Sequence, residues 1–139
     1  MIKDIVKDES MLKQKSEPFV IGADDDLIQD LLDTAHKHTP NCVGLAAPQI
    51  GVHKRAIVVL TNTGFTPMIN PVIFWKDLKT KYTAVEGCLS VDGEHEAKRF
   101  RKIKVEYTTP SGCKKSQMFT GFQAQIIQHE VDHLNGILI

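Results

Sequence analysis

Two histidines four residues apart, close to the end of the chain, are the side chains best spaced to do chemistry. Residues 128–133 read Gln-His-Glu-Val-Asp-His. On a helix, His129 and His133 project from one face, one turn apart, where both imidazoles can bind the same metal ion. Glu130 beside them can act as a general base toward a water at that ion. The spacing therefore predicts metal-assisted hydrolysis.

A catalytic site of this kind needs a third protein ligand, because three ligands and one open position are the usual arrangement. The metzincin proteases take a histidine six residues after the second one, and this chain has Ile139 there. Thermolysin-like proteases take a downstream glutamate, but residues 134–139 offer no side chain that binds a metal. Both protease interpretations lose most of their support, and we expect the third ligand upstream.

The three cysteines are the natural source of that ligand. Their odd number does not favour a disulfide framework and is typical of a reducing compartment. Cys113 lies in a polar turn, whereas Cys88 lies between a strand and a glycine-containing loop. A free cysteine is most often a small buried hydrophobic residue, and packing alone would explain Cys88. Beside a helix that lacks one ligand, however, the Cys88 thiolate becomes the leading candidate.

The composition predicts one globular domain over residues 1–139, with 42% hydrophobic and 24% charged residues. Seventeen basic residues balance seventeen acidic ones, so we expect no direct nucleic acid binding and no membrane binding. The basic residues of 98–104 alternate with apolar ones, which favours a solvated strand face over a polyanion site. The chain has no signal-peptide layout and no apolar run near the ~20 residues of a membrane span, which predicts a cytoplasmic protein.

Helical spacing of apolar residues is found in two segments. Residues 25–37 follow a group of acidic residues, which are favoured at a helix start, and we expect an irregular arm before them. The metal-binding segment has Thr120 and Gln123 in the pattern of a capping box, and Gly136 as a stop.

Strand candidates lie between these two helices. Residues 56–60 have the apolar character of a buried strand, and 68–71 and 72–75 are strands that a proline separates. Residues 102–107 and 114–119 alternate and predict a hairpin. The order predicts an α+β fold, with mostly antiparallel β-sheets packed around a C-terminal metal-binding helix and one further N-terminal helix.

Three segments, in this order, resemble the peptide deformylases. Residues 42–49 are similar to the family's Gly-x-Gly-x-Ala-Ala-x-Gln segment, residues 86–90 are a full Glu-Gly-Cys-Leu-Ser, and residues 128–133 match the histidine motif. Each alone is a modest signal, but the three together are highly specific. Two departures stand out, since Cys42 replaces the first glycine and the proline expected after Val91 is missing.

The resemblance implies a metal held by Cys88, His129 and His133, with Fe²⁺ the usual ion in the cell and Zn²⁺ or Ni²⁺ able to replace it. The implied substrates are the N-formyl-methionyl ends of nascent polypeptides, which the enzyme hydrolyses to formate and a free amine. Glu130 would be the general base.

The resemblance also assigns the groups around the substrate. The Gln49 amide and the Leu89 backbone N–H would stabilise the developing oxyanion. The substrate would add a strand beside Gly44. Glu86 would pair with Arg99, and a purely structural salt bridge is an equally good interpretation of that pair. The substrate-binding residues implied in this way are Val43, Gly44, Glu86, Arg99, Gln125 and Ile126, of which Val43, Gln125 and Ile126 line the methionine pocket.

Two other functions stay open. Cys42 and the altered loop after Ser90 motivate a deformylase-like protein that binds peptide N-termini with weak or no turnover. A hydrolase of another N-acyl group would use the same chemistry with a different pocket. Contact with the ribosome through a further C-terminal helix has no support in the sequence, because the chain stops at Ile139, and such contact stays open.

Overall fold

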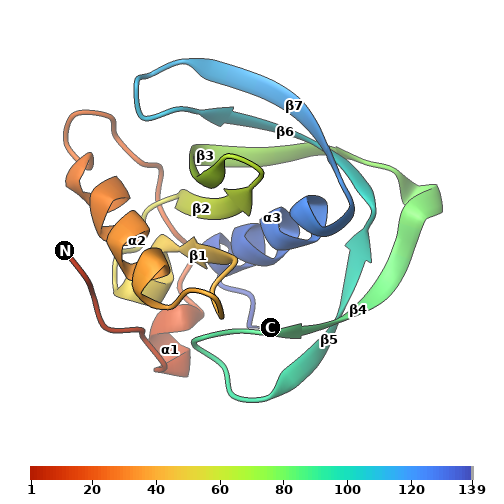
Figure 1. Ribbon diagram of the computed structural model, residues 1–139, viewed down its shortest axis with the longest axis horizontal. Coiled ribbons are helices and arrows are strands. Elements are labelled where there is room, and N and C mark those ends of the chain that lie inside the picture. Colours follow the sequence, from red (N-terminus) through yellow and green to blue (C-terminus); the bar gives the residue numbers. More distant parts are fainter. Residues whose placement is uncertain (139) are drawn as a thin grey trace.

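The fold, which a computed structural model describes for residues 1–138, combines helices with antiparallel strands (Figure 1). The helices are α1 (Glu9–Leu12), α2 (Asp26–Lys37) and α3 (Gly121–Leu134), with two short 3₁₀ turns, η1 (Ala47–Ile50) and η2 (Leu78–Thr80). The strands are β1 (Gly44–Ala46), β2 (Ala56–Thr61), β3 (Gly64–Lys76), β4 (Lys81–Gly87), β5 (Glu94–Phe100), β6 (Lys102–Thr108) and β7 (Lys114–Thr120).

The strands form two sheets around α3. Five of them lie in the order β1-β2-β3-β6-β7, and β4 pairs with β5 in a second sheet. All these pairs are antiparallel. Figure 1 shows α3 in the space that the strands surround. The expected α+β class, with antiparallel sheets around a C-terminal helix, is confirmed.

The first four residues of β2 are apolar and buried because helices cover both faces of the strand there. Ile57 and Val59 belong to the apolar cluster that contains α3, while Ala56 and Val58 belong to the cluster that contains α2. Alternate residues of a strand point to opposite faces, so a strand covered on both sides reads as a continuous apolar run. This double coverage joins the metal-binding helix to the rest of the core.

The β6–β7 hairpin has only one covered face. Ile103, Val105 and Tyr107 are buried against α3, and the residues between them face outward. This alternation is typical of an antiparallel pair with one face in water. The predicted hairpin is confirmed, with Lys102 opposite Thr120 and Thr108 opposite Lys114.

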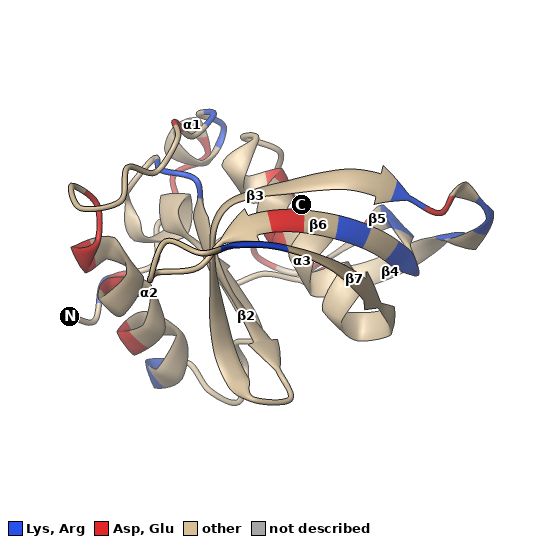
Figure 2. Cartoon of the chain, turned by 90° about the horizontal axis from the view of Figure 1, so that it is seen from above, with Lys and Arg blue, Asp and Glu red and all other residues tan. Residues whose placement is uncertain are grey.

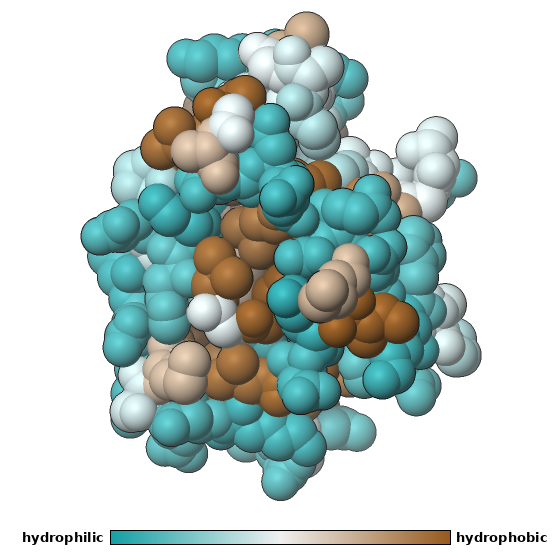
Figure 3. All heavy atoms as spheres, turned by 90° about the vertical axis from the view of Figure 1, so that its left-hand side faces the viewer, coloured by the Kyte–Doolittle hydropathy of each residue, from teal (hydrophilic) through white to brown (hydrophobic). Residues whose placement is uncertain are grey.

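Helix α2 covers the other side of β1 and β2. Its buried residues include Leu27, Leu31 and Ala35, which lie on one face at helical spacing. The side of the molecule that carries α2 is mainly hydrophilic, with a band of apolar residues at its middle (Figure 3). The predicted helix over residues 25–37 is confirmed, with Asp25 at its N-cap.

The prediction of two separate strands around Pro71 is wrong. Strand β3 continues through Pro71 as one strand, whereas the sequence predicted two strands separated by this proline. The register against β6 shifts between Ile69 and Val72, which accommodates a residue without a backbone N–H. Asn70 adopts a positive φ of 50° there, and its side chain bonds both the N–H and the carbonyl of Phe19.

Smaller differences concern the helix ends and the second sheet. The arm before α2 contains α1, which the sequence did not predict. The expected capping box at α3 is absent, since the Thr120 side chain makes no capping bond. The β4–β5 pair was not predicted either. Within residues 1–138, no helix is long and apolar enough to cross a membrane.

Candidate metal centre

Cys88, His129 and His133 come together at the end of β4 and on α3. The Cys88 Sγ lies 3.3 Å from the His133 Nε2, which lies 3.2 Å from the His129 Nε2. All three ligand atoms lie within 4.8 Å of one another. Tetrahedral coordination with bonds of about 2.0–2.3 Å separates such ligand atoms by roughly 3.3–3.6 Å. The cluster therefore fits one divalent metal ion.

One orphaned polar atom beside the cluster supports the same conclusion. Within residues 1–138, the Glu130 Oε1 is buried without a hydrogen-bond partner, as are the Ser16 Oγ and the His133 Nδ1, and His133 faces the cluster with its other ring nitrogen. Buried polar atoms are nearly always paired, so the Glu130 oxygen indicates a group that the chain itself does not supply. Burial also lowers the pKa of His133 to about 3. Its imidazole is thus neutral near pH 7, the form that binds a metal.

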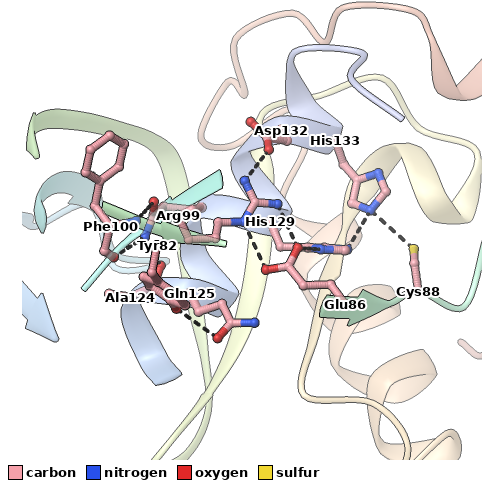
Figure 4. Close-up of polar contacts among 11 residues, drawn as sticks. Tyr82, Glu86, Cys88, Arg99, Phe100, Ala124, Gln125, His129, Asp132 and His133 are labelled. Carbon is pink, nitrogen blue, oxygen red and sulfur yellow. Dashed lines mark hydrogen bonds and ion pairs between the residues drawn. The ribbon is translucent and has the colours of Figure 1, made fainter. Parts of the chain in front are cut away.

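Glu86 orients His129. Its Oε1 accepts a hydrogen bond of 2.9 Å from the His129 Nδ1, which leaves the Nε2 of that ring for a metal (Figure 4). Arg99 donates two bonds to the Glu86 carboxylate, of 2.9 and 2.8 Å, and a third of 2.6 Å to Asp132. Burial alone would raise the pKa of Glu86, but the hydrogen bonds from His129 and Arg99 lower it to about 2. Glu86 is therefore a permanent acceptor for the ring.

Glu130 is the buried carboxyl group beside the cluster. Burial raises its pKa to about 7. A carboxyl group whose pKa lies near neutral pH can both accept and return a proton, as a general base and acid must.

Gly44 lets α3 approach β1 closely at this point. A Cβ atom at residue 44 would lie 2.7 Å from the Ile126 Cγ2 and 2.8 Å from the Glu130 Oε2. Real Cβ atoms do not come this close to other heavy atoms. The small residues of 42–49 thus serve a close approach, here by the side chains of the metal-binding helix.

Gln49 directs its amide nitrogen at the cluster. Its Oε1 accepts from the Ala46 N–H at 2.9 Å, which fixes the orientation of the amide. Its Nε2 then lies 3.3 Å from the Cys88 Sγ and 3.3 Å from the Ser90 Oγ. The neighbouring Leu89 lines the same cavity, so the two predicted oxyanion donors lie next to the metal-binding cysteine.

One cavity of about 410 Å³ contains most of the residues that the sequence singled out. Its lining includes Val43, Gly44, Gln49, Glu86, Cys88, Leu89, Gln125, Ile126, His129 and Glu130. His133 completes the metal cluster from behind and is 1% exposed. Arg99 does not line the cavity, because its guanidinium is buried between Glu86 and Asp132. This position favours the structural ion pair over contact with a substrate.

Comparisons with known proteins agree with this geometry. The family model described as polypeptide deformylase matches residues 2–139. The chain belongs to the polypeptide deformylase family. A peptide deformylase of Clostridium beijerinckii is 48% identical over 139 residues, and the alignment covers all of both chains.

Solved deformylase structures have the same fold. The peptide deformylase of Thermotoga maritima gives a TM-score of 0.90 at 32% identity, covering 99% of this chain and 95% of that one. A Met-Ala-Ser-bound class I type b deformylase of Acinetobacter baumannii gives 0.88 at 33%, covering 99% and 96%. Membership of the family makes the chain a metal-dependent hydrolase that removes N-formyl groups. A binding protein without turnover is not favoured.

Cys42, where the family pattern has glycine, is a packed thiol. It is 2% exposed, and its Sγ donates to the Gly44 carbonyl at 3.3 Å. Burial raises its pKa to about 12, so it stays a neutral thiol. This small side chain packs beside β1, as expected for a buried cysteine, and it also lines the cavity.

Sequence reasoning assigned no role to three residues that hold this deformylase site together. Asp132 binds Arg99, Gln128 bonds both backbone groups of Phe100, and Tyr82 bonds Gln125. Asp132 and Gln128 lie inside the histidine motif, so the motif itself was a signal for them. For Tyr82 the signal was its spacing of four from Glu86, which places both on one face of a strand.

Proposed function

We propose that the chain hydrolyses the N-formyl-methionyl ends of nascent polypeptides in the cytoplasm, with a metal held by Cys88, His129 and His133. One observation carries the proposal: these three ligands meet at the wall of the cavity that Cys88, His129, Glu130 and Gln49 line, with His133 behind them. Separate structural roles would not require all five side chains to converge there.

We propose Fe²⁺ as the ion in the cell, on the resemblance to the deformylases, with Zn²⁺ or Ni²⁺ as replacements. One thiolate and two imidazoles suit each of these ions. When bound, a divalent ion lowers the pKa of a water molecule and polarises a carbonyl group.

Glu130 transfers the proton in this reaction. Its carboxylate takes one proton from the attacking water as the water oxygen bonds to the formyl carbon. It returns that proton to the nitrogen as the C–N bond breaks, which yields formate and a free amine. A pKa near neutrality suits both steps.

Gln49 and Leu89 would stabilise the negative charge on the formyl oxygen in the transition state. The Gln49 amide is held by the Ala46 N–H bond before any substrate arrives. Such preorganised donors are effective because they need no rearrangement during the reaction. Loss of one donor typically lowers turnover by about 100- to 1,000-fold.

The substrate backbone would lie along β1. This strand is at the edge of its sheet, since only β2 pairs with it among the described strands. An extended peptide can pair with such an edge. Val43, Gln125 and Ile126 line the adjoining cavity, where the methionine side chain would bind. The A. baumannii relative binds Met-Ala-Ser, a peptide of this kind.

The test is formate release from formyl-Met-Ala-Ser by protein purified without oxygen and loaded with Fe²⁺ or Ni²⁺. We expect Glu130→Gln to lower kcat by about 100- to 10,000-fold, because the general base is lost. The metal content should stay that of the wild type. Glu96→Gln, the same change at an exposed residue of β5, is the control and should keep full activity.

Two results would contradict the proposal. Peptide binding without formate release by the metal-loaded protein would indicate a binding protein. Release of acetate from acetyl peptides, without turnover of formyl peptides, would indicate a hydrolase of another N-acyl group.

A further inference from the structure

Gln125 places a polar group in the part of the cavity proposed to bind the first side chain of the substrate. It precedes His129 by four residues on α3, so both side chains project from the same face of the helix. Its neighbours in the cavity lining include the apolar residues Val43, Phe122 and Ile126. A polar amide in an otherwise apolar pocket determines which occupants bind, because it favours those that can form a hydrogen bond with it.

Tyr82 fixes the orientation of this amide. Its hydroxyl donates to the Gln125 Oε1 at 3.0 Å (Figure 4). The Tyr82 ring is itself held, because the Arg101 guanidinium lies 4.1 Å from the ring centroid. Burial also raises the pKa of the Tyr82 phenol, so the proton that it donates stays in place at neutral pH.

The same strand and helix also hold the metal-binding histidine. Tyr82 and Glu86 lie on one face of β4, four residues apart, as Gln125 and His129 do on α3. Glu86 bonds His129, and Tyr82 bonds Gln125. The amide is thus positioned by the framework that positions the metal ligand.

The nitrogen of this amide makes no bond to the described residues, and Gln125 lines the cavity. In Figure 4 the nitrogen points away from Tyr82, and within residues 1–138 it donates no hydrogen bond. An amide nitrogen has two N–H donors. A norleucine side chain offers them no acceptor, a methionine thioether offers a weak one, and a methionine sulfoxide offers a strong one.

We propose that Gln125 selects substrates whose first side chain carries a hydrogen-bond acceptor, and that the chain therefore also deformylates peptides that begin with formyl-methionine sulfoxide. The inference rests on the proposed function, because it concerns the same cavity. Chains whose first methionine has been oxidised would remain substrates of the enzyme.

The test compares kcat/KM for three formyl-X-Ala-Ser peptides, in which X is methionine, norleucine or methionine sulfoxide, on nickel-loaded protein. We expect the sulfoxide peptide to be turned over within about tenfold of the methionine peptide. In Gln125→Leu, the ratio of sulfoxide to norleucine turnover should fall about tenfold or more, since a polar occupant loses its partner. Tyr82→Phe should lower the ratio less, because the amide is present but no longer held.

Gln123→Leu is the matched control, the same substitution on the same helix outside the cavity, and should leave the ratio unchanged. An unchanged ratio in Gln125→Leu would overturn the proposal, as would a wild-type protein that turns over formyl-methionine but not the sulfoxide.

Calorimetric binding of the deformylated peptides separates this proposal from the catalytic one. Tighter binding of the sulfoxide peptide than of the norleucine peptide, in protein without formate release, would support the selectivity and contradict the catalysis. Equal binding of the two would overturn the selectivity.

Discussion

Each of the three cysteines has its chemistry set by its surroundings. Cys42 is buried and neutral, with a pKa of about 12. Cys113 is exposed in the turn between β6 and β7. Cys88 is half-buried, within reach of two imidazoles and the Gln49 amide. Only Cys88 therefore has the neighbours of a metal ligand.

Cys88→Ser should lose most of its bound metal, because a hydroxyl replaces the soft thiolate that completes the site. Metal content after dialysis, measured by mass spectrometry, is the readout. Cys113→Ser makes the same change at an exposed position and should keep its metal. Equal loss in both variants would refute the ligand assignment.

At the scale of elements, the site depends on how closely α3 approaches its two neighbours. On one side, Gly44 of β1 has room for no side chain beside Ile126 and Glu130. On the other side, Arg99 of β5 joins Glu86 of β4 to Asp132 of α3. These contacts hold the histidines and the general base against the strands that carry the other site residues.

Gly44→Ala should push α3 away from β1 and lower the free energy of unfolding by about 1–3 kcal/mol, the usual cost of overpacking. Because Glu130 moves with the helix, kcat should fall as well. Urea unfolding measures the first effect and formate release the second. Gly87→Ala is the control for stability, since a Cβ there would meet nothing within 4 Å.

Arg99→Met should lower the free energy of unfolding by about 3–5 kcal/mol, because it leaves the buried Glu86 carboxylate without its partner. Removing that charge as well, in Arg99→Met with Glu86→Gln, should restore part of the loss. Lys98→Met, an exposed neighbour on β5, should change the stability by no more than about 0.5 kcal/mol. Equal losses in Arg99→Met and Lys98→Met, by urea unfolding, would contradict this role.

At the scale of the whole molecule, two apolar clusters share the sheet, and the metal centre adjoins the cluster that contains α3. The net charge is zero, and both signs are spread over the fold. Figure 2 shows acidic and basic residues on α2 and on β6 alike. Three basic side chains lie over aromatic rings, Lys76 over Phe100, Arg101 over Tyr82 and Lys104 over Trp75. The predicted lack of nucleic acid binding stays a prediction.

Leu31→Ala should destabilise the molecule without disturbing the site. Leu31 is fully buried in the cluster that contains α2, on the side of the sheet away from α3. Loss of its side chain leaves a cavity and costs about 2–5 kcal/mol. Urea unfolding should show this loss, while metal content below the unfolding transition stays that of the wild type. Lost metal in the folded variant would show that the two clusters are coupled.

Local spacing was sufficient for the helices over residues 25–37 and around His129, for the hairpin and for the metal-ligand candidates, because periodicity and motif order are properties of neighbouring residues. The prediction of two strands separated by Pro71 was wrong, because a register shift keeps β3 continuous there. Polar and apolar residues do not alternate clearly along β4 and β5, so the sequence did not predict this pair of strands.

Only the tertiary structure decided which side chains meet. The Arg99 pairing with Asp132 joins residues 33 positions apart, and Tyr82 meets Gln125 across 43 positions. No local pattern encodes such contacts, because they depend on how two elements pack. The residue types therefore specified a possible metal chemistry, and the packing of α3 between the sheets decided its geometry, its buried proton acceptor and the polar group in its cavity.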